Sequence, residues 1–435
     1  MRNVEDVAAR HLCMGCGACA GLFPDRVAMV ETADHARRPR CLTPAARSGP
    51  VADEMMRVCP GAETQYRRDE EVRGADAGLL DDWGPVLEVW EGHATDRDLR
   101  FRGSSGGLVS ALALYGIERG GMGGALHVKA RRDVPFLNES AISTSREQLL
   151  EGAGSRYAPA SPCDRLGEVE SSPRPVVFIG KPCDVAAAYR AGRERPRLRG
   201  NLGLTIGIFC AGVPSLAATF DLMRHLGADD ADDVRELRYR GRGWPGRMTL
   251  VASKPGGRTH RASVSYDEGW GEILQKKRQW RCHVCADHTG ELADLSVGDP
   301  WYRAATPGDP GKSLLVVRTE RGRRFLREAM AAGYVSVERR DPSTLPLSQP
   351  NLLRVRGSMW GRLLTLRLAG AAYPRYPGMR LFRVWRSRLS WREKAQSFYG
   401  TALRILRRRL VADERWRPFA APAEVAGARA GRGTH

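Results

Sequence analysis

Three cysteines near the start of the chain have the spacing of metal ligands. The stretch "CMGCGACAGLFP" places Cys13, Cys16 and Cys19 in a C-x2-C-x2-C pattern. The small residues between them let the backbone turn tightly, and the pattern is typical of loops that bind a 4Fe–4S cluster. In the bacterial form of this loop a fourth cysteine follows three residues later, directly before a proline. Phe23 occupies that place here, so the fourth ligand must come from elsewhere in the chain.

The fourth ligand of this first set has two candidates, Cys41 and Cys59. Cys59 precedes Pro60 in "RVCPG", and a proline there removes a backbone donor and fixes the chain direction beside a cluster. Cys41 lies in "RPRCLTP", without that context, and we interpret it as a buried thiol. Structural zinc is the alternative to a cluster, although it usually takes pairs of ligands from separate turns. The ligands that we predict for one 4Fe–4S cluster are Cys13, Cys16, Cys19 and Cys59.

A second set of cysteines begins after two predicted strands. The apolar runs "PVVFIG" (175–180) and "LGLTIGIF" (202–209) are each followed by a loop cysteine, Cys183 or Cys210, and then by a helical pattern. Loops at the carboxyl ends of parallel strands form the ligand-binding edge of an open α/β sheet, so these cysteines should lie close together. With Cys282 and Cys285 of "RCHVC" they supply the four thiolates that a second 4Fe–4S cluster needs, and zinc is again the alternative.

A glycine-rich segment predicts a helix whose start faces an anion. In "FRGSSGGLVSALALYGIERGG", residues 103–107 precede apolar residues at helical spacing, and Gly120 and Gly121 mark the end of the helix. Amides and serine hydroxyls at a helix N-terminus favour a cofactor phosphate, but close packing against a strand would explain the glycines equally well. The segment "GAGSRYAPASPC" (152–163) adds another loop of small residues, with an arginine that can contact a phosphate or a flavin.

The composition indicates a globular protein of two or three domains. The chain has 435 residues, 42% of them hydrophobic, and no run of 18 consecutive apolar residues. Its start, "MRNVEDVAARHLC", carries acids where a signal peptide needs an apolar run, so we expect a cytoplasmic protein. In a reducing compartment the ten cysteines are better explained as metal ligands than as disulfides. No Ser-His-Asp arrangement or P-loop is apparent, which leaves hydrolysis and phosphoryl transfer without support.

The formal net charge of +19 is concentrated near the C-terminus, where residues 375–416 contain 12 Lys and Arg against 3 Asp and Glu. Within them, "SWREKAQSFYGTALRILRRRLV" predicts a helix that begins with a capping box at Ser390 and Glu393. This helix would pack on the core, lie on an anionic membrane surface, or dock an acidic partner such as a ferredoxin; we favour the partner over the membrane. The predicted apolar face contains Trp391, Ala395, Phe398, Ala402, Ile405 and Leu406.

A nucleic-acid binding function has little support, although the charge and Trp385, Trp391 and Trp416 suggest it. Most surface arginines form only a solvated face, and the sequence contains no recognisable nucleic-acid module. We therefore expect no nucleic-acid partner.

The order of these motifs resembles the beta subunit family of coenzyme F420 hydrogenase/dehydrogenase, over roughly residues 13–338. The motifs that carry the resemblance are "GSSGG", "GSRY", "GKPCD", "FCAGVPS", "RYRGRGW", "RCHVC", "LADLSVGDPW" and "GKSLLVVRTERG". Members include hydrogenase and dehydrogenase subunits that act on F420, and 7-hydroxymethyl chlorophyll a reductase, which uses ferredoxin. The resemblance implies a reductase that binds FAD and 4Fe–4S clusters. It assigns Cys183, Cys210, Cys282 and Cys285 to the second cluster, and the flavin surroundings to Ser104, Ser105, Gly106, Gly107, Ser155, Arg156, Tyr157, Gly180 and Lys181.

Three departures from the family pattern concern the substrate. The family usually has Gly-Thr-Pro-Cys, Cys-His-Gly and Ser-Lys-Tyr, where this chain has "GKPC", "CAG" and "SRY". The cysteines are retained, but F420 is only a possible substrate. Lys181, in place of the threonine, is our candidate catalytic residue, because it can hydrogen-bond a reduced flavin or stabilise its negative charge. A lysine merely exposed on a loop is the alternative.

We therefore expect a mixed α/β (α+β) protein in three parts. Residues 1–85 would form a ferredoxin-like 4Fe–4S module, residues 86–350 an α/β flavin and iron–sulfur core, and residues 351–435 a basic helical extension with a disordered tail. The expected function is electron transfer between a ferredoxin or reduced deazaflavin-type carrier and a small acceptor, since a flavin takes two electrons and releases them singly. The alternative is a non-catalytic electron-transfer subunit that feeds a partner enzyme.

Overall fold

The centre of the molecule is a mixed β-sheet. The computed structural model describes residues 1–32, 36–66, 73–229, 232–306 and 308–412, and these residues form eight strands in one sheet. In spatial order the strands are β13 (Val335–Arg340), β3 (Glu88–Ala94), β12 (Ser313–Val317), β11 (Leu295–Gly298), β7 (Leu202–Ile208), β6 (Val176–Gly180), β4 (Gly124–Ala130) and β5 (Asn138–Ser143). β11, β7, β6 and β4 run parallel to their neighbours in this group, while the strands toward both edges pair antiparallel. The expected mixed α/β class is confirmed.

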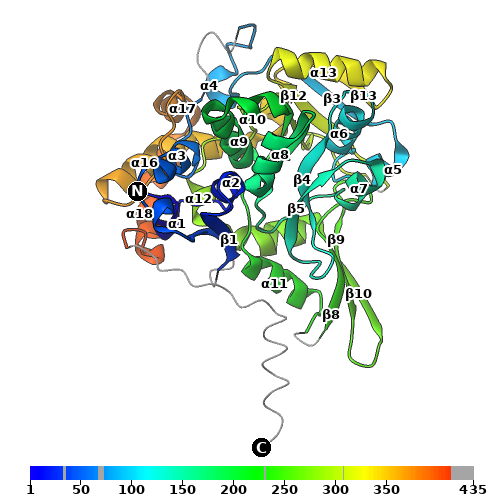
Figure 1. Ribbon diagram of the computed structural model, residues 1–435, viewed down its shortest axis with the longest axis horizontal. Helices are drawn as coiled ribbons and strands as arrows, with labels where there is room; N and C mark the ends of the chain where they lie inside the picture. Colours follow the sequence, from blue (N-terminus) through cyan, green and yellow to red (C-terminus); the bar gives the residue numbers. More distant parts are fainter. Residues whose placement is uncertain (33–35, 67–72, 230–231, 307, 413–435) are drawn as a thin grey trace, which may run out of the picture.

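Helices cover both faces of this sheet (Figure 1). β6 is buried along its whole length because successive side chains point into two different cores. Val177 and Ile179 belong to one core, and Val176 and Phe178 belong to the other. The first core is closed by α6 (Leu108–Glu118) and α13 (Glu320–Ala331), and the second by α8 (Leu166–Ser171), α9 (Pro182–Glu194) and α10 (Pro196–Asn201).

The two strand–loop–helix units predicted around Cys183 and Cys210 are confirmed. β6 leads into α9, β7 leads toward α11 (Leu216–His225), and the two strands are parallel neighbours. Their carboxyl ends therefore lie at the same edge of the sheet. The predicted glycine-flanked helix is α6, which ends at Glu118 just before the glycines.

The N-terminal segment has a small core of its own, and it also packs on the helices that cover one face of the central sheet. Its own small core contains Val4, Val27 and Met55. Leu22 and Val58, however, belong to the core beneath α9, together with residues of the C-terminal helices. The cores thus cross the expected boundaries near residues 85 and 350, and the three-part division stays a prediction. The N-terminal elements are α1 (Val4–Ala9), α2 (Ala18–Leu22), β1 (Val27–Glu31), β2 (Arg37–Cys41) and α3 (Pro50–Val58).

A smaller antiparallel sheet lies beside the main one, and α11 packs on it through Leu216 and Leu222, which contact the core of Met248 and Leu250 (Figure 1). Its strands are β8 (Asp233–Arg238), β9 (Arg247–Ser253) and β10 (Thr259–Ser265). Short helices complete the connections: α4 (Leu80–Trp83), α5 (Arg97–Arg102), α7 (Arg146–Glu151) and α12 (Trp280–His283). Further single turns are η1 (Pro44–Ala46), η3 (Pro162–Arg165), η4 (Asp267–Ile273) and η5 (Leu274–Lys277).

The C-terminal helices lie next to the N-terminal ones (Figure 1). Leu366 and Ile405 of the C-terminal helices share a core with Val7 and Leu12. No helix in the described residues is long and apolar enough to cross a membrane. The tail beyond residue 412, with Trp416, lies outside the described residues. The helices are α14 (Thr344–Ser348), α15 (Pro350–Gly357), α16 (Met359–Leu368), α17 (Leu381–Arg388) and α18 (Trp391–Arg408).

Helix α18 begins with the predicted capping box: the Glu393 amide donates to Ser390 Oγ, and the Ser390 amide donates to the Glu393 carboxylate. The predicted apolar face is only partly buried: Ile405 is buried and Phe398 is half-buried. Ser397 and Thr401, which were not predicted to face the core, are also buried. Ser397 packs closely against Gly361 of α16, where an added Cβ would clash with the serine side chain. Four members of the predicted face are exposed instead: Trp391, Ala395, Ala402 and Leu406.

Candidate functional site

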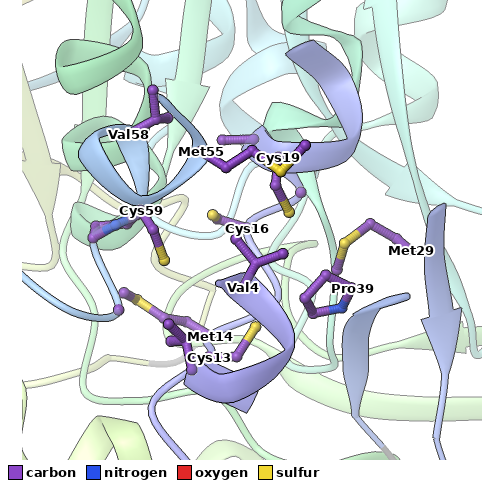
Figure 2. A pocket seen from close by; sticks show the side chains of 15 residues that line it. Val4, Cys13, Met14, Cys16, Cys19, Met29, Pro39, Met55, Val58 and Cys59 are labelled. Atoms are coloured by element: carbon purple, nitrogen blue, oxygen red, sulfur yellow. The ribbon is translucent and has the colours of Figure 1, made fainter. Parts of the chain in front are cut away.

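Four cysteine side chains line one cavity in the N-terminal part of the molecule. Cys13 and Cys16 lie in the loop between α1 and α2, Cys19 lies in α2, and Cys59 directly follows α3. In Figure 2 their sulfur atoms face a common space. The structure therefore brings together the four residues predicted to bind the first cluster. The remaining wall is largely apolar and includes Val4, Val7, Met14, Met29, Met55 and Val58.

Two glycines shape the loop that carries these cysteines. Gly15 and Gly17 have φ angles of +70° and +85°, which residues other than glycine rarely adopt. A Cβ on Gly15 would also lie 2.8 Å from the carbonyl oxygen of Arg37. The turn directs the Gly15 amide toward Cys13 Sγ, 3.4 Å away, where it stabilises negative charge on the sulfur.

Two of the ten cysteines, Cys41 and Cys163, belong to neither predicted set and lie outside the wall of this cavity. Cys41 is buried near η1, where its thiol donates to the carbonyl oxygen of Ala46 at 3.6 Å. Cys163 lies behind Cys16: its amide donates to the Cys16 carbonyl oxygen at 2.9 Å, and its thiol donates to the Asp184 carbonyl oxygen. These contacts are those of buried thiols that pack inside the protein, so we interpret Cys41 and Cys163 in this way.

The second set of four cysteines lines a second cavity. Cys183 lies in the first turn of α9, Cys210 follows β7, Cys282 lies in α12 and Cys285 follows it. Backbone amides again approach the sulfurs, since Gly212 N donates to Cys210 Sγ and Val213 N to Cys282 Sγ, at 3.4 and 3.3 Å. The parallel pair β6–β7 thus brings two cysteines to one sheet edge, and the segment around α12 supplies the other two.

The two cavities adjoin each other. Met14 lines both of them. Arg38 connects the two walls through hydrogen bonds. Its Nη1 donates to the Cys13 carbonyl oxygen at 3.2 Å and to Gln279 Oε1 at 2.9 Å. Cys13 lines the first cavity and Gln279 lines the second. The two cavities therefore share part of one wall.

Burial disfavours free thiolates in both cavities. It raises the pKa of Cys59, Cys210 and Cys285 to about 12, and it raises the pKa of Cys19 and Cys183 well above the ordinary value. Metal ions stabilise thiolates, so such groups of buried thiols suit a metal centre.

A single metal ion and a 4Fe–4S cluster require different spacings of their thiolate ligands. Among the described residues, no three His, Cys, Asp or Glu side chains are placed to hold one metal ion. Zinc binds thiolates at ~2.3 Å, which brings their sulfurs to within about 4 Å of one another. A 4Fe–4S cluster binds each thiolate through a different iron atom, so its ligands lie further apart.

The serines predicted near a flavin are brought together. Ser104 Oγ accepts hydrogen bonds from the Ser155 amide and hydroxyl at 2.7 and 2.8 Å. Gly106 and Gly107 precede α6 with positive φ angles, and a Cβ on Gly107 would lie 2.4 Å from the Leu99 carbonyl oxygen. Close packing thus explains this glycine, and the anion-binding role of the segment stays a prediction. Ser105 contacts Ser313 on β12.

Arg156 and Tyr157 are already engaged within the protein. The Arg156 guanidinium donates to Asn138 Oδ1 and to the carbonyl oxygens of Leu237 and Pro135, each at 2.7 Å. Burial lowers its pKa. The Tyr157 ring packs 4.9 Å from Trp270. Because the donors of Arg156 are occupied, its contact with a cofactor phosphate has no support in this geometry.

Lys181 and Gly180 lie beside the second cavity. Lys181 Nζ donates to both carboxylate oxygens of Asp184 at 2.7 Å, and Asp184 is buried. Burial alone would lower the pKa of Lys181. The Asp184 carboxylate and Cys183 outweigh this effect and raise the pKa. Lys181 is therefore not merely exposed on a loop. A Cβ on Gly180 would lie 2.8 Å from Asp184 Cβ, so the glycine makes room for this ion pair.

Two quoted motifs meet in a way that sequence reasoning missed. Arg240 of "RYRGRGW" is buried and forms a bidentate ion pair with Asp299 of "LADLSVGDPW" at 2.7 and 2.8 Å. It also donates to the Ser104 carbonyl oxygen, and Trp244 Nε1 donates to Asp299. Trp301 stacks on Tyr266 at 5.3 Å beside this pair. Both motifs were recognised, but only the tertiary contact reveals that they support the serine pair.

Two family models match the chain, and both describe the beta subunit of coenzyme F420 hydrogenase/dehydrogenase. The model of its N-terminal part matches residues 89–166, and the model of its C-terminal part matches residues 174–343. The two segments cover more than half of the chain. The second cavity's cysteines lie within the matched segments, whereas the first cavity's cysteines and the helices from α14 onward lie outside them.

Curated proteins that are similar to this chain are named as beta subunits of F420 hydrogenases and F420-dependent formate dehydrogenases. A coenzyme F420 hydrogenase subunit beta of Methanococcus voltae is 27% identical over 57% of this chain and 82% of its own length. An F420-dependent formate dehydrogenase 1 subunit beta of Methanococcus maripaludis is 26% identical over 60% of this chain and 64% of its own. A chain of the xenon-derivatised F420-reducing [NiFe] hydrogenase complex of Methanosarcina barkeri aligns with a TM-score of 0.48 and 21% identity, covering 64% of this chain and 93% of that one.

Proposed function

Since the chain belongs to the coenzyme F420 hydrogenase/dehydrogenase beta subunit family, we propose that it is an electron-transfer oxidoreductase subunit that uses two 4Fe–4S clusters and FAD. The observation that carries the proposal is the pair of adjoining cavities, each lined by four cysteines. The relatives named as hydrogenase and formate dehydrogenase beta subunits support the same class of reaction. The proposed carriers are a ferredoxin or a reduced deazaflavin such as F420, with a small molecule as the other reactant.

The protein would bind each cluster in a largely apolar, buried cavity. The clusters would supply one-electron transfer, and the flavin would supply the exchange between two-electron and one-electron chemistry. The walls exclude water, and the amides of Gly15, Gly212 and Val213 stabilise charge on the sulfurs. The proposed ligands are Cys13, Cys16, Cys19 and Cys59 for the first cluster, and Cys183, Cys210, Cys282 and Cys285 for the second.

The FAD site is proposed at the start of α6, where Ser104 and Ser155 meet and Arg240 holds the Ser104 backbone. An amide-rich helix start and serine hydroxyl groups suit a phosphate. Lys181 is proposed to stabilise negative charge on the reduced flavin, as an ammonium group held by Asp184.

Anaerobic purification with analysis of iron, sulfide and flavin tests this proposal. We expect about eight irons per chain and one flavin, followed by turnover in a screen of F420, ferredoxin and small acceptors. A preparation that contains iron for neither cavity would contradict the proposal.

A subunit without its own substrate site is the second candidate. It is favoured because the relatives are named as subunits of larger enzymes. Protein that holds both clusters, binds no flavin at micromolar concentration and turns over no small substrate would support this candidate over the reductase.

A further inference from the structure

Arg281 of "RCHVC" lies between the two cysteine cavities. It belongs to α12, is only 3% exposed, and lines the second cavity. Its Nη1 donates to the carbonyl oxygen of Val284, between Cys282 and Cys285, at 3.2 Å. Its Nη2 donates at 3.2 Å to the carbonyl oxygen of Pro60, which directly follows Cys59 and lines the first cavity. One guanidinium group thus ties a cysteine loop of each cavity to the other.

The charge of this arginine has no partner of the usual kind. Within the described residues Arg281 forms no ion pair with a carboxylate, and its Nε has no hydrogen-bond acceptor. Its guanidinium carbon lies 5.5 Å from the centre of the Tyr376 ring, a cation–π contact that supplies no full negative charge. Two other buried arginines, Arg240 and Arg356, are paired with Asp299 and Glu291. Burying an arginine without a counter-charge is strongly unfavourable, because its charge loses the solvation by water. The position of Arg281 against both cavities indicates that the counter-charge comes from what they bind.

A 4Fe–4S cluster with four thiolate ligands supplies such a charge, because it is negative in total and becomes more negative on reduction. A buried cation attracts the reduced form more strongly than the oxidised form, which raises the reduction potential. We propose, on the basis of the function proposed above, that Arg281 is a positioning residue that joins the two cluster loops and raises the reduction potentials of both clusters.

A nearby arginine gives a matched control. Arg278 donates to the carbonyl oxygen of Ala211, next to Cys210, at 2.7 Å, so it contacts a loop of the second cavity only. It is also less buried than Arg281. Arg278→Gln removes the same charge and should shift the potential of the second cluster alone.

The test is a redox titration of anaerobic holoprotein followed by electron paramagnetic resonance, with iron measured in each variant. The first cluster is identified as the signal that Cys59→Ala removes. We expect Arg281→Gln to shift both potentials to more negative values. Arg281→Lys keeps the charge, so its potentials should stay close to the wild-type values. Unchanged potentials of both clusters in an Arg281→Gln variant with full iron content would overturn the inference.

Arg281→Lys decides the outcome if Arg281→Gln fails to retain iron. Full iron and near-normal potentials in Arg281→Lys would support the role of the charge. Shifted potentials or loss of iron in that variant, with Arg278→Gln intact, would overturn it, because the charge would then not be sufficient. Wild-type protein without clusters would instead contradict the proposed function before any variant is compared.

Discussion

Cys59 completes the first cysteine set. Replacing it tests whether Cys59 or Cys41 is the fourth ligand of the proposed first cluster. Cys59 lines the cavity and Cys41 lies apart from it, although burial raises the pKa of both thiols to about 12. We expect Cys59→Ala to remove about half of the iron and one of the two cluster signals, and Cys41→Ala to leave both. Iron analysis and low-temperature spectra of the two variants would show this. The reverse pattern would move the ligand assignment to Cys41.

Lys181 combines a proposed catalytic role with a structural one. Its partner Asp184 is buried, so Lys181→Met would leave an unpaired carboxylate in the core. Breaking a buried ion pair costs about 3–5 kcal/mol, and we expect urea unfolding to show a loss of this size. The double variant Lys181→Met/Asp184→Asn should recover much of it, because no charge remains. If the single variant unfolds at the wild-type urea concentration, the ion pair is not structurally important.

The double variant also tests the flavin proposal. Its flavin content should match the wild-type value, while the potential of the flavin should become more negative, since the cation that favours the reduced form is gone. An unchanged flavin potential would remove Lys181 from the catalytic residues.

Helix α18 buries only part of the apolar face that the sequence predicts. Ile405 is 6% exposed and shares a core with Leu12 and Trp280, whereas its neighbour Leu406 is 74% exposed. Ile405→Ala should therefore lower the free energy of unfolding by about 2–5 kcal/mol. Leu406→Ala should change it by less than about 0.5 kcal/mol. Denaturant unfolding of the two variants measures both, and equal losses would mean that the helix packs on its other face.

At the level of the whole molecule, the inner face of α18 is buried and its outer face carries exposed arginines, which we propose as a docking surface for an acidic partner. Arg392 and Arg407 are exposed on it. We expect Arg392→Glu/Arg407→Glu to slow reduction by an acidic carrier such as ferredoxin at low salt, because electrostatic steering is lost, and the difference should shrink at high salt.

The matched control is Arg197→Glu/Arg199→Glu on α10, which makes the same change in net charge at another exposed site. Stopped-flow kinetics at several ionic strengths compare the two. Equal slowing in both variants would show that only the net charge matters. Binding of the wild type to anionic vesicles, lost in the α18 variant without a kinetic change, would favour a membrane surface over a protein partner.

Much of this protein was accessible from its sequence, because the relevant signals are local. The C-x2-C-x2-C and C-x2-C spacings depend only on tight backbone turns, and the order of strand, loop cysteine and helix at Cys183 and Cys210 follows from periodicity. The strand and helix predictions were confirmed, as was the capping box of α18. These features are set by neighbours in the chain.

The remaining features depend on contacts between distant segments, which no local pattern contains. Met14 lines both cavities because the loop between α1 and α2 lies next to the distant segments that carry the second cysteine set. Arg281 reaches Pro60 across 221 positions of the sequence, and Arg240 reaches Asp299 across 59. The buried side of α18 includes Ser397, which packs against Gly361 of α16, because the contacts with a neighbouring helix, and not the hydrophobicity of the segment alone, determine which residues are covered.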